Sequence, residues 1–370
     1  MARLGKAARC AACGIAFALA AFVGQMAQAE DKEVRVYNWS DYIDPKILED
    51  FTKETGIKVV YDVFDSNEVL ETKLLAGKTG YDVVVPTASF LSRQIKAGVF
   101  QKLDKSKIPN ISNIWPEVYN RVAIYDPGND YAMNWMWGTT GVGYNEAKIK
   151  ERMPDAPVGS LDMILKPEIA AKFKDCGIHM LDSPEDIVPV VLNYLGIDPN
   201  TTDPDDLKKA EDVLTKIRPY VKKFHSSEYI NALANGDICM ALGWSGDILQ
   251  AASRATEAKN GQVIKYNIPK EGTQMWFDMM AIPADATHVE EAHIFLNYLN
   301  KAEVMAKASN FVQYANGNLA SQKFIDESVL KNPAVYPDAD TLKKLYVKTT
   351  WDNKTQRLVT RMWTRIVTGQ

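Results

Sequence analysis

The sequence lacks the charge balance and the long apolar runs that several broad classes of protein need. Its formal net charge is −4 over 370 residues, with 4 cysteines and 4 histidines. Because nucleic-acid binding needs a basic face, this balance argues against that class. Beyond residue 29 no apolar stretch approaches the length that spans a membrane, and there are no repeats or low-complexity tracts. A modest negative charge is compatible with a cationic ligand.

The motifs of nucleotide-binding proteins, hydrolases and metalloenzymes are also missing. AGKTG at residues 76–80 resembles a phosphate loop, but that motif needs a glycine where the chain has Thr72. GWSGD at residues 243–247 is G-x-S-G and not the G-x-S-x-G of a nucleophile elbow. No H-E-x-x-H or calcium-loop spacing occurs. We predict no catalytic residue, no metal and no cofactor, and keep an exported hydrolase as the alternative from another class.

The first 29 residues have the pattern of a signal peptide. Three basic residues precede a short apolar run, and AQA at residues 27–29 is a cleavage site of the A-x-A type. The leader carries three Lys and Arg and no acid, so the chain that remains has a net charge of about −7. We therefore predict an exported, soluble protein that begins near Glu30.

Cysteine usage supports an oxidising compartment. Cleavage removes Cys10 and Cys13, whose C-x-x-C spacing we interpret as part of the leader, and leaves Cys176 and Cys239. Two cysteines in an exported chain predict one disulfide, with two buried free thiols as the alternative.

Strands and helices alternate along the chain, which indicates an α/β fold. We expect strands at 34–39, 57–64 and 81–87 and helices at 45–56, 66–78 and 89–98 in the first hundred residues. A helix-rich middle follows, then strands at 237–244, 263–269 and 275–283, and helices dominate from residue 289. About 340 residues are too many for one ordinary core, so we expect two lobes.

Three tryptophans mark a candidate cleft. Trp39 and Trp244 end predicted strands, and Trp276 lies in a third, each followed shortly by Ser or Asp. Packing is the ordinary role of such a tryptophan, but ligands of open α/β sheets sit at the carboxyl ends of strands. Carboxylates and indole faces together suit a small ammonium ligand, through charge-assisted hydrogen bonds and cation–π attraction. The methylene groups of a linear diamine would pack on the same aromatic faces.

Seven stretches resemble the bacterial periplasmic putrescine-binding proteins, the solute receptors of polyamine ABC importers. They are YNWSDYI, AGKTGYDVVVPTASFL, MWGTTGVGYN, LNYLG, FHSSEYINALANGDICMALGWSGD, IPKEG and NPAVYPDAD. The resemblance implies a periplasmic-binding-protein-like fold, with two α/β lobes, a β-stranded hinge and a ligand in the cleft between lobes. We expect the first lobe in residues 30–137 and 262–304, and the second in 138–261 and 305–370.

The same resemblance implies the ligand-binding residues, position by position. They are Trp39, Ser40, Asp41, Tyr42, Thr87, Ser89, Ser183, Asp186, Trp244, Asp247, Trp276, Asp278 and Tyr314. It also implies the Cys176–Cys239 disulfide, permease subunits of an ABC importer as partners, and a monomer in the periplasm.

The sequence departs from the family at positions that bear on the ligand. Asp186 is one methylene shorter than the family's glutamate, and Trp276 stands where putrescine receptors have Phe and spermidine binders have Trp. Thr87 and Ser89 are small, as in putrescine binders. Lys348 lies near a position that is apolar or Gln in the family, and we interpret it as a solvated lysine. We predict a putrescine-preferring receptor, with spermidine or another cationic amine such as agmatine as the alternative.

Overall fold

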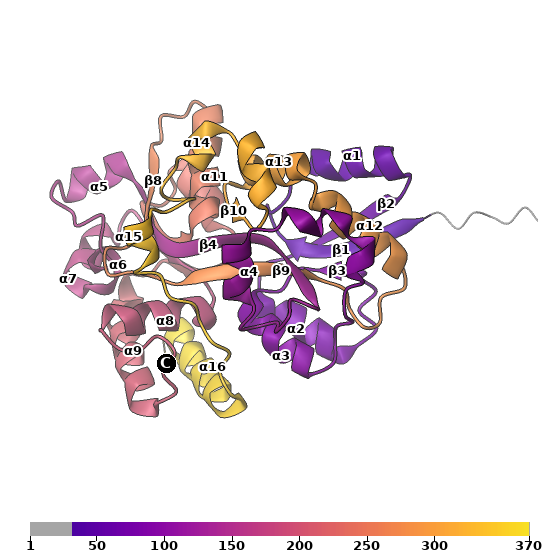
Figure 1. Ribbon diagram of the computed structural model, residues 1–370. Coiled ribbons are helices and arrows are strands. Elements are labelled where there is room, and N and C mark those ends of the chain that lie inside the picture. The colour runs from indigo at the N-terminus through magenta and orange to yellow at the C-terminus, as the bar shows by residue number, and fades with distance from the viewer. Residues whose placement is uncertain (1–31, 370) are drawn as a thin grey trace, which may run out of the picture.

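The computed structural model describes residues 32–369 and shows a mixed α/β protein built on one ten-stranded sheet (Figure 1). The predicted signal peptide, Cys10 and Cys13 lie outside the described residues. The strands are β1 (Glu33–Trp39), β2 (Lys58–Phe64), β3 (Val83–Val84), β4 (Ala132–Asn145), β5 (Ile178–Met180), β6 (Lys223–Phe224), β7 (Met240–Trp244), β8 (Ile264–Asn267), β9 (Met275–Ala281) and β10 (Ala315–Asn316).

The helices surround this sheet. They are α1 (Pro45–Thr55), α2 (Asn67–Ala76), α3 (Ala88–Lys96), α4 (Pro116–Val122), α5 (Glu146–Arg152), α6 (Asp162–Leu165), α7 (Pro167–Ala170), α8 (Pro184–Tyr194), α9 (Pro204–Ile217), α10 (Tyr229–Asn235), α11 (Ser245–Glu257), α12 (Val289–Leu299), α13 (Ala302–Val312), α14 (Glu327–Leu330), α15 (Ala339–Leu342) and α16 (Asn353–Thr368). Among the described residues no helix is both long and apolar enough to cross a membrane.

Local sequence signals explain where the first elements begin and end. Asp44 accepts a hydrogen bond from the amide of Lys46, which caps α1, and Gly56 ends that helix in the left-handed region at φ 71°. Ser66 caps α2 through the amide of Val69. The predicted β-α-β-α-β-α order of the first hundred residues is therefore confirmed, although β3 is only two residues long.

Strand β4 connects the two halves of the sheet. The strand order is β2-β1-β3-β9-β4-β7-β5-β6, with β8 and β10 also paired to β4. The first part of β4 pairs with β9, from Ala132 to Thr139, and the second part pairs with β7 from Thr140 to Tyr144. One continuous strand of 14 residues thus crosses from one half of the molecule to the other, as a β-stranded hinge does.

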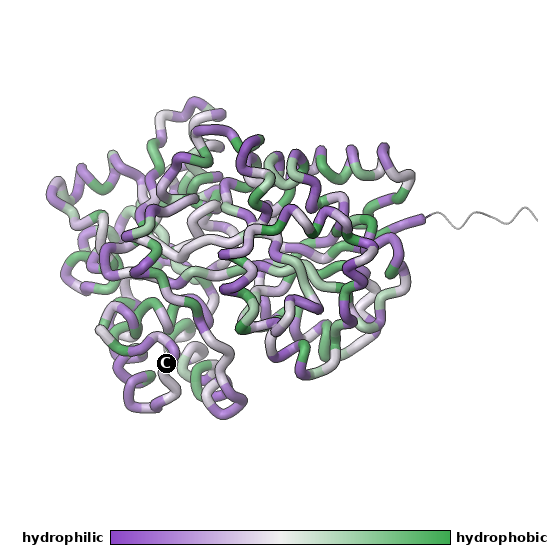
Figure 2. Tube along the Cα trace, viewed as in Figure 1, coloured by the Kyte–Doolittle hydropathy of each residue, from purple (hydrophilic) through white to green (hydrophobic). Residues whose placement is uncertain are grey.

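The buried apolar side chains form two separate clusters. Tube colouring by hydropathy shows apolar and polar residues alternating along the outer helices of both halves, as in helices with one buried face (Figure 2). The first cluster draws on residues 34–137 and 275–345, and the second on residues 142–266 and 351–366. Trp244, Leu249 and Ile268 pack against both clusters. We call the two halves the first and the second lobe.

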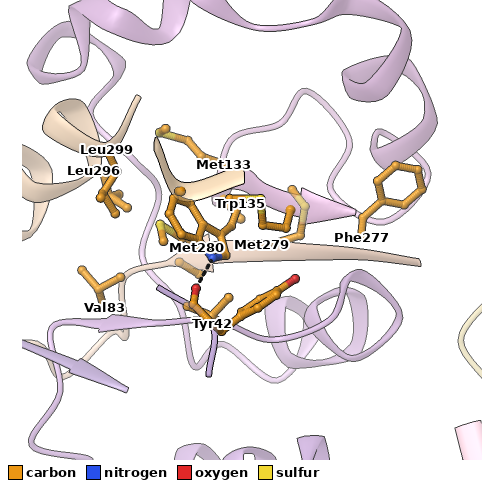
Figure 3. Close-up of a cluster of buried hydrophobic side chains, with 14 of the residues drawn as sticks. Tyr42, Val83, Met133, Trp135, Phe277, Met279, Met280, Leu296 and Leu299 are labelled. Atoms are coloured by element: carbon orange, nitrogen blue, oxygen red, sulfur yellow. Dashed lines mark hydrogen bonds between the residues drawn. The ribbon is translucent and has the colours of Figure 1, made fainter. Parts of the chain in front are cut away.

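Trp135 lies at the centre of the first lobe. It is fully buried, among residues of β3, β4, β9 and α12 (Figure 3). Its indole Nε1 donates a hydrogen bond of 3.3 Å to the carbonyl oxygen of Tyr42. This contact fixes the loop after β1, which carries the predicted WSDY segment.

The lobe boundaries predicted from the sequence differ from the two clusters in two places. Ile264 and Tyr266 belong to the second cluster, and buried residues from 305 to 345 belong to the first. We propose that the first lobe consists of residues 32–139 and 275–346, and that the second consists of 140–268 with the C-terminal segment from residue 350. The chain therefore crosses between the lobes three times.

The Cys176–Cys239 disulfide is confirmed. The two Cα atoms are 5.5 Å apart, and the bond joins positions separated by 63 residues within the second lobe. It does not cross between the lobes, so it leaves their relative movement free.

We predict that the disulfide stabilises the second lobe by about 4 kcal/mol, because it restricts a loop of 63 residues in the unfolded chain. Urea unfolding with and without reductant measures the difference. Thiol labelling of the denatured, unreduced mature protein is expected to find no free cysteine. Two labelled thiols, or an unchanged unfolding midpoint after reduction, would contradict the prediction.

Candidate ligand site in the cleft between the lobes

A narrow cavity lies between the lobes, at the edge of the sheet where β1, β3 and β7 end. The volume of this cavity is about 30 Å³. Eleven of the thirteen predicted residues line this cavity: Trp39, Ser40, Tyr42, Thr87, Ser89, Asp186, Trp244, Asp247, Trp276, Asp278 and Tyr314. The two that do not are Asp41 and Ser183.

Sheet topology explains why distant residues meet here. β1 and β3 are parallel, so their carboxyl ends lie at one edge, and Trp39 ends β1 at that edge. β9 is antiparallel to β3, so its amino-terminal part, with Trp276 and Asp278, lies at the same edge. Because Trp276 and Asp278 are two residues apart in a strand, their side chains share one face. Trp244 ends β7 on the other lobe.

Aromatic rings form a continuous wall. The rings of Trp39 and Trp244 are 5.5 Å apart in an edge-to-face arrangement that joins the two lobes. The distance between ring centroids is 6.4 Å for Trp244 and Trp276, 5.2 Å for Trp276 and Tyr314, and 5.4 Å for Tyr314 and Tyr42. Each contact is edge to face, which leaves ring faces turned toward other groups.

Gly246 allows this wall to close against α11. A Cβ atom at residue 246 would lie 2.4 Å from the ring of Tyr314, so no larger residue fits without displacing that ring. This explains the second glycine of GWSGD. Ser245 in the same motif accepts a hydrogen bond of 3.3 Å from the Thr139 amide, and no histidine lines the cavity.

Asp278 is the buried carboxylate of the first lobe. Its two oxygens accept hydrogen bonds of 2.7 Å from the hydroxyl groups of Tyr42 and Thr87. Asn67 in turn donates to the Thr87 hydroxyl oxygen at 2.9 Å, which orients it. In the part of the chain that the structure describes, two hydroxyl groups and no Lys, Arg or His hold this carboxylate in place.

Asp247 is the corresponding carboxylate of α11. Its oxygens accept hydrogen bonds of 2.7 Å from the hydroxyl groups of Tyr229 and Tyr314. The Asp247 amide donates to the Tyr314 oxygen at 3.1 Å. Because Tyr314 belongs to the first cluster and Asp247 to α11, this carboxylate connects the two lobes.

Asp186 lies in the first turn of α8. One oxygen accepts from Ser183 at 2.6 Å, and the other accepts from Thr140 and from the indole of Trp244, both at 3.2 Å. Ser183 therefore orients this carboxylate from outside the cavity. Both Asp186 and Asp247 lie at helix amino termini, where the helix dipole favours negative charge.

Burial raises the pKa of all three carboxyl groups despite these hydrogen bonds. Desolvation raises the pKa of Asp278 to about 7 and that of Asp247 to about 6, and it also raises the pKa of Asp186. The negative charges of Asp186 and Asp247 raise the pKa of Asp278 further. No Lys or Arg lines the cavity in the described part of the chain.

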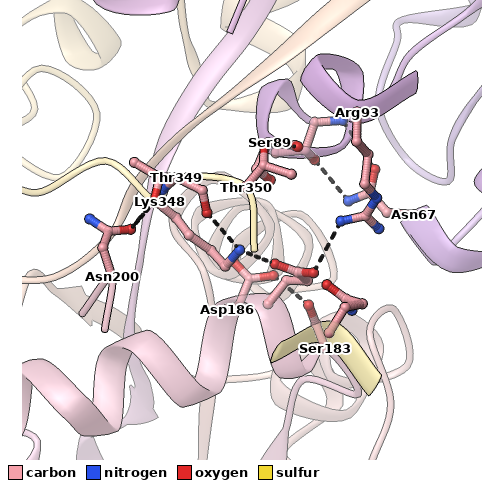
Figure 4. Close-up of polar contacts among 12 residues, drawn as sticks. Asn67, Ser89, Arg93, Ser183, Asp186, Asn200, Lys348, Thr349 and Thr350 are labelled. Carbon is pink, nitrogen blue, oxygen red and sulfur yellow. Dashed lines mark hydrogen bonds and ion pairs between the residues drawn. The ribbon is translucent and has the colours of Figure 1, made fainter. Parts of the chain in front are cut away.

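Lys348 is buried, so the expectation of a solvated lysine is wrong. Its ammonium pairs with Glu185, donates to the carbonyl of Thr349 at 3.0 Å and lies 3.8 Å from the ring of Trp351. Glu185 also pairs with Arg93 of α3 at 3.4 Å (Figure 4). The segment before α16 runs between the lobes, and Glu185 supplies the counter-charge that burial of an ammonium needs.

This ion cluster neutralises itself. Arg93 pairs with Glu71 at 2.6 Å as well as with Glu185, so the cluster contains two acidic and two basic side chains. Most of its positive charge is therefore engaged within the cluster, although Lys348 is close enough to feel the charge of Asp186. Lys348 reaches only a small adjoining space, which Thr87, Ser89, Gln274 and Trp276 also line.

Asp41 lies outside the cavity, at its rim, where it forms an ion pair between the lobes. It is exposed, has a positive φ of 57°, and pairs with Arg254 of α11 at 2.6 Å. The structure therefore places this predicted ligand residue in a contact between the lobes.

Six lining residues were missed by sequence reasoning. They are Asp65, Asn67, Phe90, Glu185, Ser226 and Gln274. The position of Glu185 next to Asp186 is a sequence signal that marks it, whereas no motif marks Gln274 or Asn67. In the described residues no group of acidic, histidine or cysteine side chains is arranged to hold a metal ion.

Comparison with known proteins finds relatives that are all bacterial solute-binding proteins. Residues 46–337 match the family model described as bacterial extracellular solute-binding protein. The chain is 56% identical to the putrescine-binding periplasmic protein SpuD of Pseudomonas aeruginosa over 96% of this chain and 98% of that protein. It is 54% identical to the putrescine-binding periplasmic protein PotF of Escherichia coli, over 95% of both.

A solved structure shares the fold. It is the spermidine/putrescine ABC transporter substrate-binding protein PotD of Streptococcus pneumoniae, with a TM-score of 0.73 and 31% identity over 91% of this chain and 99% of that one. The two-lobed fold class predicted from the sequence is thereby confirmed.

We predict that Asp278 makes the ligand-free protein less stable as pH rises from about 4 to about 7. In this window the folded state, with its raised pKa, binds more protons than the unfolded state, so the free energy of unfolding falls with pH. Asp278→Asn removes this loss. Its free energy of unfolding is therefore expected to rise by about 2 to 4 kcal/mol relative to that of wild type between pH 4.5 and 8. Urea unfolding across that range measures the gain. The matched control is the exposed Glu49→Gln, and a gain that does not depend on pH would refute the interpretation.

Proposed function

The chain belongs to the family of bacterial extracellular solute-binding proteins, and on that premise we propose that it is a periplasmic polyamine receptor that delivers its ligand to an ABC importer. It is a binding protein and not an enzyme. The preferred ligand of this receptor is putrescine, and spermidine binds more weakly.

The observation that supports this function best is a set of three buried aspartates in a cavity that no Lys or Arg of the described residues lines. Burying an unpaired carboxylate costs several kcal/mol, so such a set is retained where a ligand supplies the missing positive charge. Asp278, Asp247 and Asp186 are all held in fixed orientations by hydroxyl or indole donors. A diamine brings two ammonium groups, and the aromatic wall provides ring faces for both charge and methylene groups.

Small side chains at two lining positions favour the short diamine. Thr87 and Ser89 line the cavity, and spermidine binders of the family have bulkier aromatic residues at the second of these positions. The relatives SpuD and PotF, each more than half identical, are both named as putrescine-binding. Trp276 argues for a longer ligand. A 39% identical relative named as putrescine/agmatine-binding keeps agmatine as the alternative.

Location and partners follow from the same relatives. SpuD and PotF are named as periplasmic proteins, and the predicted leader of residues 1–29 suits export. A receptor of this kind passes its ligand to permease subunits in the membrane. We propose that it does so as a monomer.

We expect calorimetry of the mature protein against putrescine, spermidine, spermine, cadaverine and agmatine to show putrescine binding most tightly. Asp278→Asn and Asp247→Asn are each expected to weaken putrescine binding by about 3 kcal/mol, two orders of magnitude, because one ammonium loses its buried partner. Glu49→Gln, which removes one exposed charge, is expected to bind like wild type.

Two results would count against this proposal. Affinity near that of wild type in both aspartate variants would show that the ligand sits elsewhere. Putrescine and spermidine both binding more weakly than about 100 μM (about 5.5 kcal/mol) would defeat the polyamine assignment and bring agmatine forward.

We predict that putrescine shifts the protein toward the arrangement seen here, in which the lobes touch. Ligand contacts from both lobes favour that state by the difference in affinity between the two states. Asp41 and Arg254 already pair across the cleft at 2.6 Å. Small-angle scattering is expected to show a smaller radius of gyration with putrescine, and Asp247→Asn a smaller change. An identical radius with and without saturating putrescine would disprove lobe closure.

A further inference from the structure

A second cavity adjoins the aromatic site between the lobes. Asp65 and Ser226 line both spaces, so the two cavities meet. The second cavity is larger, with a volume of about 280 Å³. Glu68 of α2 in the first lobe and Thr360, Trp363 and Thr364 of α16 in the second lobe line it, and Figure 1 shows where these two helices lie. The other lining residues are Ser66, Asp182, Pro184 and His225.

Glu68 is the unexplained group in this cavity. Its Oε2 accepts a hydrogen bond of 2.9 Å from Ser66, whereas its Oε1 is shielded from solvent and has no hydrogen-bond partner in the described residues. Burial raises the pKa of this carboxyl group to about 7. An acceptor oxygen that is buried and unpaired costs free energy, which a donor from a ligand would recover.

The rest of the lining offers acceptors and an aromatic face. Asp65 and Asp182 add two carboxylates, and the Trp363 indole is held by a hydrogen bond of 2.7 Å to Asp182. The Thr360 and Thr364 hydroxyls donate to backbone carbonyls of their own helix, so their oxygen lone pairs remain for a donor. His225 is the one lining side chain here that can carry positive charge.

This chemistry suits an organic cation better than a metal ion. The described residues contain no group of acidic or histidine side chains placed to ligate one metal. Carboxylates at separate points along a cavity instead suit an ammonium group on a flexible chain. The indole face of Trp363 also attracts such a cation.

We propose that this second cavity is a subsite for the overhanging ammonium of a polyamine longer than a diamine. One end of the ligand occupies the aromatic site and the chain passes Asp65 and Ser226. The terminal ammonium donates to Glu68, whose shielded Oε1 turns toward the cavity to accept it. The inference rests on the proposed polyamine function and goes beyond it, because it assigns a site to the third charge of a triamine.

The test separates the overhang from its charge. Spermidine and N-propylputrescine have the same length of overhanging carbon chain, but only spermidine ends in an ammonium. In wild type, calorimetry is expected to show spermidine binding about fivefold more tightly than N-propylputrescine. In Glu68→Gln this ratio is expected to fall to about one, with putrescine affinity unchanged within twofold.

Two further variants make the outcome decisive. Asp65→Asn lies on the path between the cavities and is expected to reduce the same ratio, which covers a Glu68 variant that folds poorly. Glu49→Gln is the control for loss of one charge from the first lobe, and it is expected to keep the wild-type ratio.

Three results would overturn the subsite. The ratio is already one in wild type, or Glu68→Gln keeps it, or that variant weakens putrescine and spermidine equally, as expected of an entry passage. Failure of the proposed function looks different, because wild type would then bind none of the three amines.

Discussion

Burying three carboxylates in a cavity that no Lys or Arg of the described residues lines is the constraint on which this structure depends. Asp278, Asp247 and Asp186 each receive two or more hydrogen bonds, yet burial still raises the pKa of each. Nearby positive charge exists, but Glu185 and Glu71 already engage Lys348 and Arg93. The cleft is therefore a site whose electrostatic cost remains until a cation arrives, which makes a cationic ligand a part of the most stable state.

Sheet topology turns that local cost into a property of both lobes. Asp278 stands on β9 of the first lobe, whereas Asp186 and Asp247 stand at the amino termini of helices in the second. β4 runs through both lobes, so the two groups of acids can separate only by bending this strand and the segments near it. A ligand that satisfies acids on both sides thus acts on the hinge as well as on the cavity.

Sequence patterns marked Trp39, Trp244 and Trp276 at or near strand ends, whereas the resemblance to the family supplied the full set of thirteen candidate residues. Eleven of these line one cavity, and their contact with a ligand stays a prediction. The predictions failed where long-range packing decides. Nothing near Lys348 in sequence indicates that Glu185 neutralises it, and no local pattern shows that residues 305–345 pack on the first lobe. No local pattern shows that Asn67 orients Thr87, because the two hydrogen-bonded residues are 20 positions apart.

The route of the chain through the two cores has a consequence for how the molecule assembles. The first core includes residues up to Leu345, and the second includes α16 as far as Ile366. Neither core can be completed by a growing chain until nearly all of it has been made. Such a chain presents few finished, compact units during synthesis. That property suits passage through a membrane in extended form, with folding deferred to the far side, where the disulfide can also form.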